Sequence, residues 1–136
     1  MFRRASSLSQ KPYIRASYTA HVHFILRQLR ATDLYRLQLN ANLVTLSACE
    51  TALSSISKGD DLLGLTRGLL YAGARSIVSS LWKVDDLATK DLMLAFYRNL
   101  QDMDKDQALA QAQRTLKKSH PHPFYWAAFQ LTGAAD

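Results

Sequence analysis

Two short apolar runs rich in β-branched residues recur along the chain, and small or polar residues end each of them. Residues 43–49 read Leu-Val-Thr-Leu-Ser-Ala-Cys, and residues 76–82 read Ser-Ile-Val-Ser-Ser-Leu-Trp. Runs of this length and composition predict buried strands. Between them, leucines at helical spacing predict a helix that begins at Asp60 or Asp61 and ends at Gly73. The order strand, helix, strand predicts a parallel pair joined by a crossover helix.

Beyond residue 84 the apolar positions follow the period of helices. One helix, capped by Asp85 or Asp86, is predicted from an apolar stripe at Leu92, Met93, Phe96, Tyr97 and Leu100. A second helix, with a start like a capping box at Asp104 and Gln107, is predicted from Ala108, Leu109, Ala112 and Leu116. Lys117 and Lys118 suit its C-terminal end, and residues 120–123 stop it. Residues 124–131 then predict a closing strand or an aromatic segment packed on the sheet.

The N-terminal part of the chain carries weaker patterns. Residues 1–16 lack periodicity and predict a disordered or non-native leader. Residues 17–29 include a β-prone run that predicts a strand at a sheet edge, and residues 32–37 predict a short helix. We therefore expect one globular domain over residues 17–136.

The net charge of +6 by itself would indicate nucleic-acid binding, but the positions of the charges along the chain argue against it. Residues 1–32 hold six basic and no acidic side chains, whereas residues 33–136 hold eleven of each sign. A basic patch across the domain is therefore not supported, and we expect no nucleic-acid partner. One cysteine allows no internal disulfide, and no apolar run approaches the roughly 20 residues of a membrane span. These features predict a cytoplasmic protein without membrane contact.

Cys49 stands at the tip of the first of the two predicted strands. Loops that leave the carboxyl ends of strands form the ligand crevice of open parallel sheets, so this thiol stands where such folds place their chemistry. A nucleophilic thiol needs a neighbouring imidazolium or a helix N-terminus to form thiolate near neutral pH. The alternative is an inert residue, because free cysteine is among the most buried residue types.

Four ordered motifs carry a family resemblance: Leu43–Thr51, Gly64–Ser76, Ser79–Asp86 with Thr89, and Pro123–Phe129. Together they resemble the C-terminal half of a CHAT domain, a caspase-like cysteine peptidase domain often attached to tetratricopeptide repeats. The resemblance implies a caspase–haemoglobinase fold of α/β class, with three α/β/α layers and a mostly parallel sheet. It also implies a peptide or protein as substrate or partner, a repeat region in complete relatives, and no metal or other cofactor.

The resemblance implies that Cys49 is the nucleophile of a cysteine–histidine dyad, in which a glycine follows the histidine. Here no histidine precedes a glycine, and all five glycines lie after Cys49. We therefore expect a partial peptidase domain that is inactive alone. His21 and His23 are substitute candidates for the base, with a solvated or edge-strand histidine as the alternative. A second interpretation is a non-catalytic interaction module on the same fold.

By the same resemblance, four residues after the second strand are candidates for the substrate pocket: Ser80, Trp82, Asp85 and Asp86. An acidic wall would suit a basic side chain. The competing interpretation makes the two aspartates helix caps and places Trp82 in the core. If the first strands of the fold are missing, the strand before Cys49 has an unpaired edge, through which the chain would self-associate.

Overall fold

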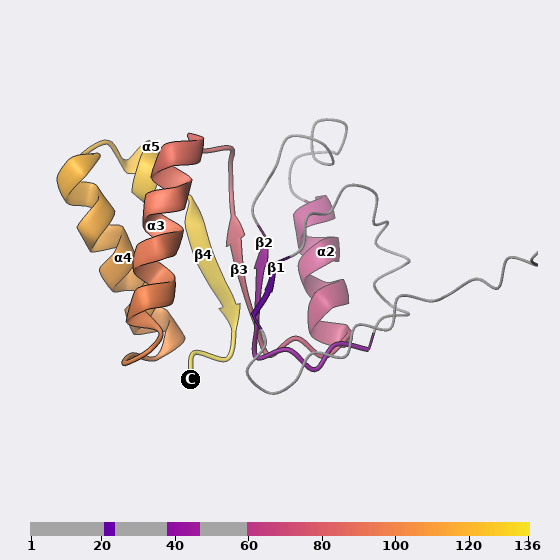
Figure 1. Cartoon of the computed structure of the whole chain (residues 1–136). Helices are drawn as coiled ribbons and strands as arrows, with labels where there is room; N and C mark the ends of the chain where they lie inside the picture. Colours follow the sequence, from indigo (N-terminus) through magenta and orange to yellow (C-terminus); the bar gives the residue numbers. More distant parts are fainter. Residues whose placement is uncertain (1–20, 24–37, 47–59) are drawn as a thin grey trace, which may run out of the picture.

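The protein is described by a computed structural model that covers residues 21–23, 38–46 and 60–136 (Figure 1). In chain order its elements are β1 (His21–His23), β2 (Leu43–Leu46), α2 (Asp60–Tyr71), β3 (Ser76–Ser80), α3 (Asp86–Asn99), α4 (Lys105–Ser119), α5 (Pro123–Trp126) and β4 (Phe129–Gly133). The predicted leader and the predicted helix over residues 32–37 lie outside the described residues. Within the described residues, no helix combines the length and the apolar character that a membrane crossing needs.

The described strands form one sheet in the order β1-β2-β3-β4. β1 pairs with β2 and β2 pairs with β3 in parallel, whereas β4 runs antiparallel to β3. The predicted parallel crossover from β2 through α2 to β3 is therefore confirmed, as is a mostly parallel sheet of α/β class. Because β2 lies between two parallel neighbours, all four of its residues are buried. The predicted unpaired edge at the strand before Cys49 is therefore wrong, since β1 pairs with that strand.

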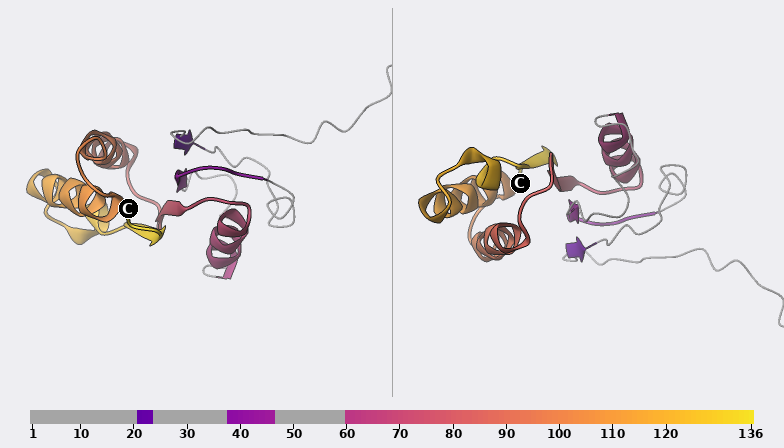
Figure 2. Two further views of the ribbon diagram at one scale, coloured as in Figure 1. Left: turned by 90° about the horizontal axis from the view of Figure 1, so that it is seen from below. Right: turned by 90° about the horizontal axis from the view of Figure 1, so that it is seen from above.

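Helices pack against the sheet through two separate apolar clusters. Leu43 of β2 and Val78 of β3 contact the cluster built from α3 and α4, in which Phe96 is fully buried. Val44 and Ile77 belong to the cluster that includes α2. Successive strand residues point to opposite faces, so the two clusters lie on opposite sides of the sheet. Figure 2 shows α2 on one side of the strands and α3 with α4 on the other.

The end of α2 follows the prediction made for Gly73. Its φ of 109° lies in the left-handed region, and the Ala74 N–H donates a hydrogen bond to the Leu69 carbonyl across the turn. A Cβ at Gly73 would overlap the Leu39 carbonyl oxygen. A glycine is therefore required both by the backbone conformation and by the close passage of the chain before β2.

Two predicted strand boundaries are wrong. The second strand stops at Ser80 instead of residue 82, and the closing strand begins only at Phe129. Pro123–Trp126 form α5 because proline suits a first helical turn and the His122 ring accepts the Phe124 N–H at 3.2 Å. Asp104 does precede α4, but its side chain makes no capping hydrogen bond, so the start is not a capping box.

Candidate functional site

The candidate site lies at the carboxyl edge of the three parallel strands. β1 ends at His23, β2 at Leu46 and β3 at Ser80. Because the three strands are parallel, their carboxyl ends lie at the same edge of the sheet. Cys49 itself lies outside the described residues. The structure follows its strand to Leu46, three residues before the thiol.

The two histidines considered as bases sit at opposite ends of β1. His23 is in register with Thr45, and His21 is in register with Leu43. His21 and His23 are two positions apart along the strand, which is about 6.6 Å. The backbone therefore brings His23 nearer than His21 to the edge where β2 leads to Cys49.

Trp82 lies two residues beyond β3, in the loop that leaves the carboxyl edge. Its side chain is 37% exposed, so its predicted alternative as a core residue is wrong. The indole N–H donates a 2.9 Å hydrogen bond to the Phe124 carbonyl, and the two rings stack with centroids 6.3 Å apart. Phe124, which is 45% exposed, is a neighbour of Trp82 that the sequence did not reveal, because its contact depends on α5. Ser80, by contrast, is buried opposite Phe129.

The two aspartates after Trp82, Asp85 and Asp86, differ in their hydrogen bonds to the start of α3. The Asp85 carboxylate accepts the N–H groups of Leu87 at 3.1 Å and Ala88 at 3.2 Å, which is the N-cap of α3. The capping interpretation is therefore confirmed for Asp85. Asp86 is exposed in the first turn of the same helix. An acidic wall at this edge would be provided chiefly by Asp86.

A hydroxyl pair formed by a buried threonine and a half-buried tyrosine joins β2 to α3. Thr45 is 1% exposed, and its hydroxyl lies 2.6 Å from the Tyr97 hydroxyl. The sequence placed Tyr97 on the apolar stripe of α3 but did not predict its polar partner. This contact fixes the last turns of α3 against β2 one residue before the strand ends.

A buried charge lies at the opposite edge of the sheet. Lys105 is 4% exposed, and its ammonium donates a hydrogen bond to the Asp136 backbone oxygen. Burial lowers the pKa of Lys105, opposed in part by the attraction of the Asp136 charge. Arg75, which precedes β3, pairs with the Asp136 carboxylate at 3.2 Å. Across the described part of the chain, His, Cys, Asp and Glu side chains form no group of three that could hold a metal ion.

A family model described as the CHAT domain matches residues 16–134. The chain belongs to the CHAT domain family. The match runs through the strand that leads to Cys49, the crossover helix α2 and the α3–α4 pair. The family match therefore confirms the CHAT-domain resemblance that the four sequence motifs indicated.

Two curated relatives of this CHAT domain carry the name Tetratricopeptide repeat protein 28. The human protein (Homo sapiens) is 36% identical over 109 residues, and the mouse protein (Mus musculus) is 38% identical over 109 residues. Both alignments cover 78% of this chain and 4% of the relative. The CHAT domain described here thus spans a small fraction of the relatives that it matches.

Proposed function

We propose that residues 17–136 form part of a CHAT-type cysteine peptidase domain in which Cys49 is the nucleophile. The observation that carries this proposal is the position of β2, which lies between two parallel neighbours and whose last described residue, Leu46, precedes Cys49 by three positions in the sequence. We further propose the three-layer caspase–haemoglobinase arrangement for the complete domain. Support comes from the two apolar clusters on opposite faces of the sheet.

The proposed reaction is acyl transfer followed by hydrolysis. The Cys49 thiolate attacks the peptide carbonyl carbon, the carbon–nitrogen bond breaks as the amine takes a proton, and water then cleaves the thioester. An unassisted thiol has a pKa near about 8.5, so little thiolate forms at neutral pH. Loss of a paired base removes on the order of 10²–10⁴ in rate. Because this sequence holds no histidine followed by glycine, we propose that the chain is inactive alone.

The proposed substrate wall is formed by Trp82 with Phe124 and Asp86. An exposed indole attracts cations, and the exposed Asp86 carboxylate four residues farther along the chain adds to the same preference. Both features support a basic side chain in the substrate. Asp85 is a weaker candidate, because its carboxylate already accepts two backbone N–H groups. Ser80 is buried, so we propose that it shapes the floor beneath the loop.

A non-catalytic interaction module is the second candidate function. The observation that favours it is the exposed Trp82–Phe124 pair, which a hydrogen bond holds in place without any catalytic group. Rigid aromatic side chains of this kind are enriched at protein interfaces. The name of the relatives supports a tetratricopeptide-repeat region as the neighbouring partner.

The experiment that tests the proposal is labelling of Cys49 by a peptidyl electrophile across about pH 5–9. Cys49 is the only cysteine, so the Cys49→Ser variant supplies the blank. His23→Ala is compared with His21→Ala, which serves as the matched control because it lies farther from the carboxyl edge. We expect slow labelling that rises toward the pKa of an ordinary thiol and is equal in both histidine variants.

Two other outcomes would change the assignment. Rapid labelling near neutral pH that falls in His23→Ala alone would mean that the chain carries a working dyad, and the proposed inactivity would be wrong. A Cys49 that stays unlabelled at high pH in the folded chain, yet reacts after unfolding, would mean a buried thiol. That result would favour the interaction module.

A further inference from the structure

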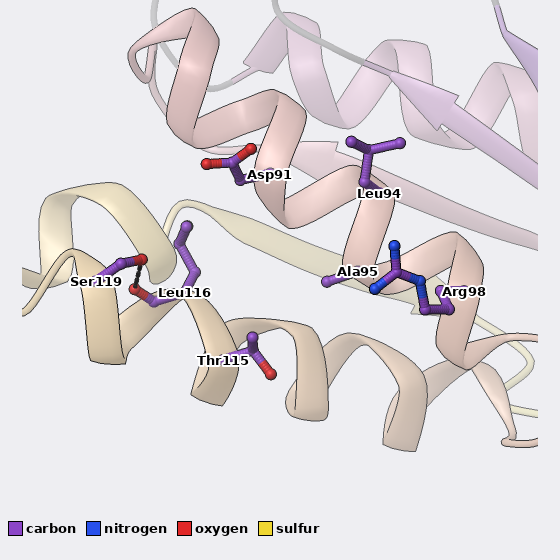
Figure 3. A pocket seen from close by; sticks show the side chains of 7 residues that line it. All are labelled: Asp91, Leu94, Ala95, Arg98, Thr115, Leu116 and Ser119. Atoms are coloured by element: carbon purple, nitrogen blue, oxygen red, sulfur yellow. Dashed lines mark hydrogen bonds between the residues drawn. The ribbon is translucent and has the colours of Figure 1, made fainter.

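A shallow groove of about 310 Å³ runs between α3 and α4 on the side away from the sheet. Figure 3 shows its lining, with Asp91, Leu94, Ala95 and Arg98 from α3 and Leu116 among the residues from α4. The apolar part consists of Leu94, Ala95 and Leu116. Along α3, the acidic Asp91 lies at one end of this apolar part and the basic Arg98 lies at the other end.

The outer face of α3 carries two exposed leucines. Leu87 is 69% exposed and Leu94 is 55% exposed. With Asp91 and Arg98 they follow the spacing 87, 91, 94 and 98, which is the alternation of four and three residues found along the seam of packed helices. Neither Asp91 nor Arg98 has an ion-pair partner among the residues that the structure describes.

This face is complementary to itself. An acidic side chain at position 91 and a basic one at position 98 bracket a leucine and an alanine. If two such helices cross antiparallel about the point between Leu94 and Ala95, each Asp91 meets the Arg98 of the other copy. Each Leu94 then lies opposite the small Ala95 of the other helix. A two-fold axis generates both pairs at once, which is the signature of an isologous interface.

We propose that α3 is a homodimerisation surface at which two copies of this chain pair antiparallel through Asp91, Leu94 and Arg98. The occupant of the groove is thus a second copy, because one copy supplies both charges that the other requires. The contact is independent of the sheet edge at β1 and does not depend on the proposed chemistry of Cys49. A single helix face buries less area than a permanent dimer does, so the association is weak and depends on concentration.

The test is sedimentation velocity on the full chain from about 10 µM to about 1 mM. Arg98→Asp leaves two acidic positions in the interface, and Asp91→Arg leaves two basic ones. Each variant alone is expected to dimerise at least about tenfold more weakly than the native chain, because like charges then meet. Mixed in equal amounts, the two variants are expected to form a heterodimer. The double variant Asp91→Arg/Arg98→Asp is expected to recover self-association.

Lys90→Asp is the matched control, because it changes the net charge as Arg98→Asp does at an exposed position of α3 outside the stripe. It is expected to dimerise like the native chain. Circular dichroism checks that each variant keeps its helices. A native chain that stays monomeric at the highest concentration would overturn the proposal. Association that all charge variants retain would also overturn it and would assign the contact to another surface, such as the β1 edge.

Discussion

Gly73 is the residue at which the chain turns from α2 toward β3, and its surroundings leave no space for a side chain. Its φ is 109°, and a Cβ would overlap the Leu39 carbonyl oxygen. Gly64, in the same segment, is different: it lies within α2, and a Cβ there would meet nothing within 4 Å. The two glycines therefore form a matched pair in which the same substitution has opposite consequences.

We predict that Gly73→Ala lowers the free energy of unfolding by roughly 2 kcal/mol or more, since strain and overlap add. Gly64→Ala should raise it by about 0.5–1 kcal/mol, because alanine favours a helix interior. Urea denaturation of both variants and the native chain measures the two changes. A neutral Gly73→Ala would mean that the turn has room to move.

Lys105 combines near-complete burial with a charge. Because burial is the largest influence, its pKa lies below the ordinary value of 10.5. Between that lowered pKa and 10.5 the unfolded chain binds more protons than the folded one, so raising the pH in this window stabilises the fold. The gain is complete once the pH exceeds the pKa of the unfolded chain.

We predict that the native chain gains stability relative to Lys105→Met as the pH rises toward 10.5 through the window above the lowered pKa of Lys105. The methionine cannot titrate, so the difference between the two chains isolates the lysine. Urea denaturation of both chains at each pH provides the measurement. A difference that shrinks as the pH rises would mean that attraction to Asp136 outweighs burial.

At the scale of elements, the start of α3 depends on a single carboxylate. Asp85 accepts two backbone N–H groups, whereas Asp86 acts on the same helix end only through its charge. We predict that Asp85→Ala costs about 1 kcal/mol of stability. Asp86→Ala should cost about 0.5 kcal/mol or less at low salt. Thermal and urea unfolding of both variants compares them, and an equal or reversed order would contradict the assignment of the cap.

The sequence predicted elements whose signals are local. β2, β3, α2, α3 and α4 follow from apolar periodicity with helix caps and a terminal glycine, and all five are present. The sequence did not predict the features that depend on tertiary contacts. Residues 124–131 were predicted as a closing strand or an aromatic segment packed on the sheet, and the first part of this run instead belongs to α5, whose packing on α4 no local pattern reveals. The end of β3 was placed two residues late because nothing local marks where the pairing with β4 stops.

The candidate site was predictable to a similar limit. A motif at a strand end made Cys49 the candidate nucleophile, and the structure shows that strand in the expected place without describing the thiol. Asp85 and Asp86 were both candidates from the sequence, but the sequence did not show which of the two caps α3. The Trp82–Phe124 and Thr45–Tyr97 contacts join positions 42 and 52 residues apart, a range that no local pattern reveals.

At the scale of the whole molecule, the Thr45–Tyr97 hydrogen bond links the layer of α3 and α4 to the centre of the sheet. We predict that Tyr97→Phe costs about 1–3 kcal/mol, because it leaves the buried Thr45 hydroxyl without this partner. In a Thr45→Val background the same change should cost less, since no hydroxyl is left unpaired there. A double-mutant cycle by urea denaturation measures the coupling, and a coupling near zero would mean that the two hydroxyls do not interact in solution.

The antiparallel pairing of β3 with β4 also has a consequence for synthesis. Ser76 pairs with Gly133 and Ser80 with Phe129, so α3, α4 and α5 are all made between the two partners. At about 5–20 residues per second, the ribosome takes several seconds to add this segment. During that interval β3 presents an unpaired edge to the cell. The nascent chain is therefore most exposed to aggregation or chaperone binding after its central strands exist and before the final one emerges.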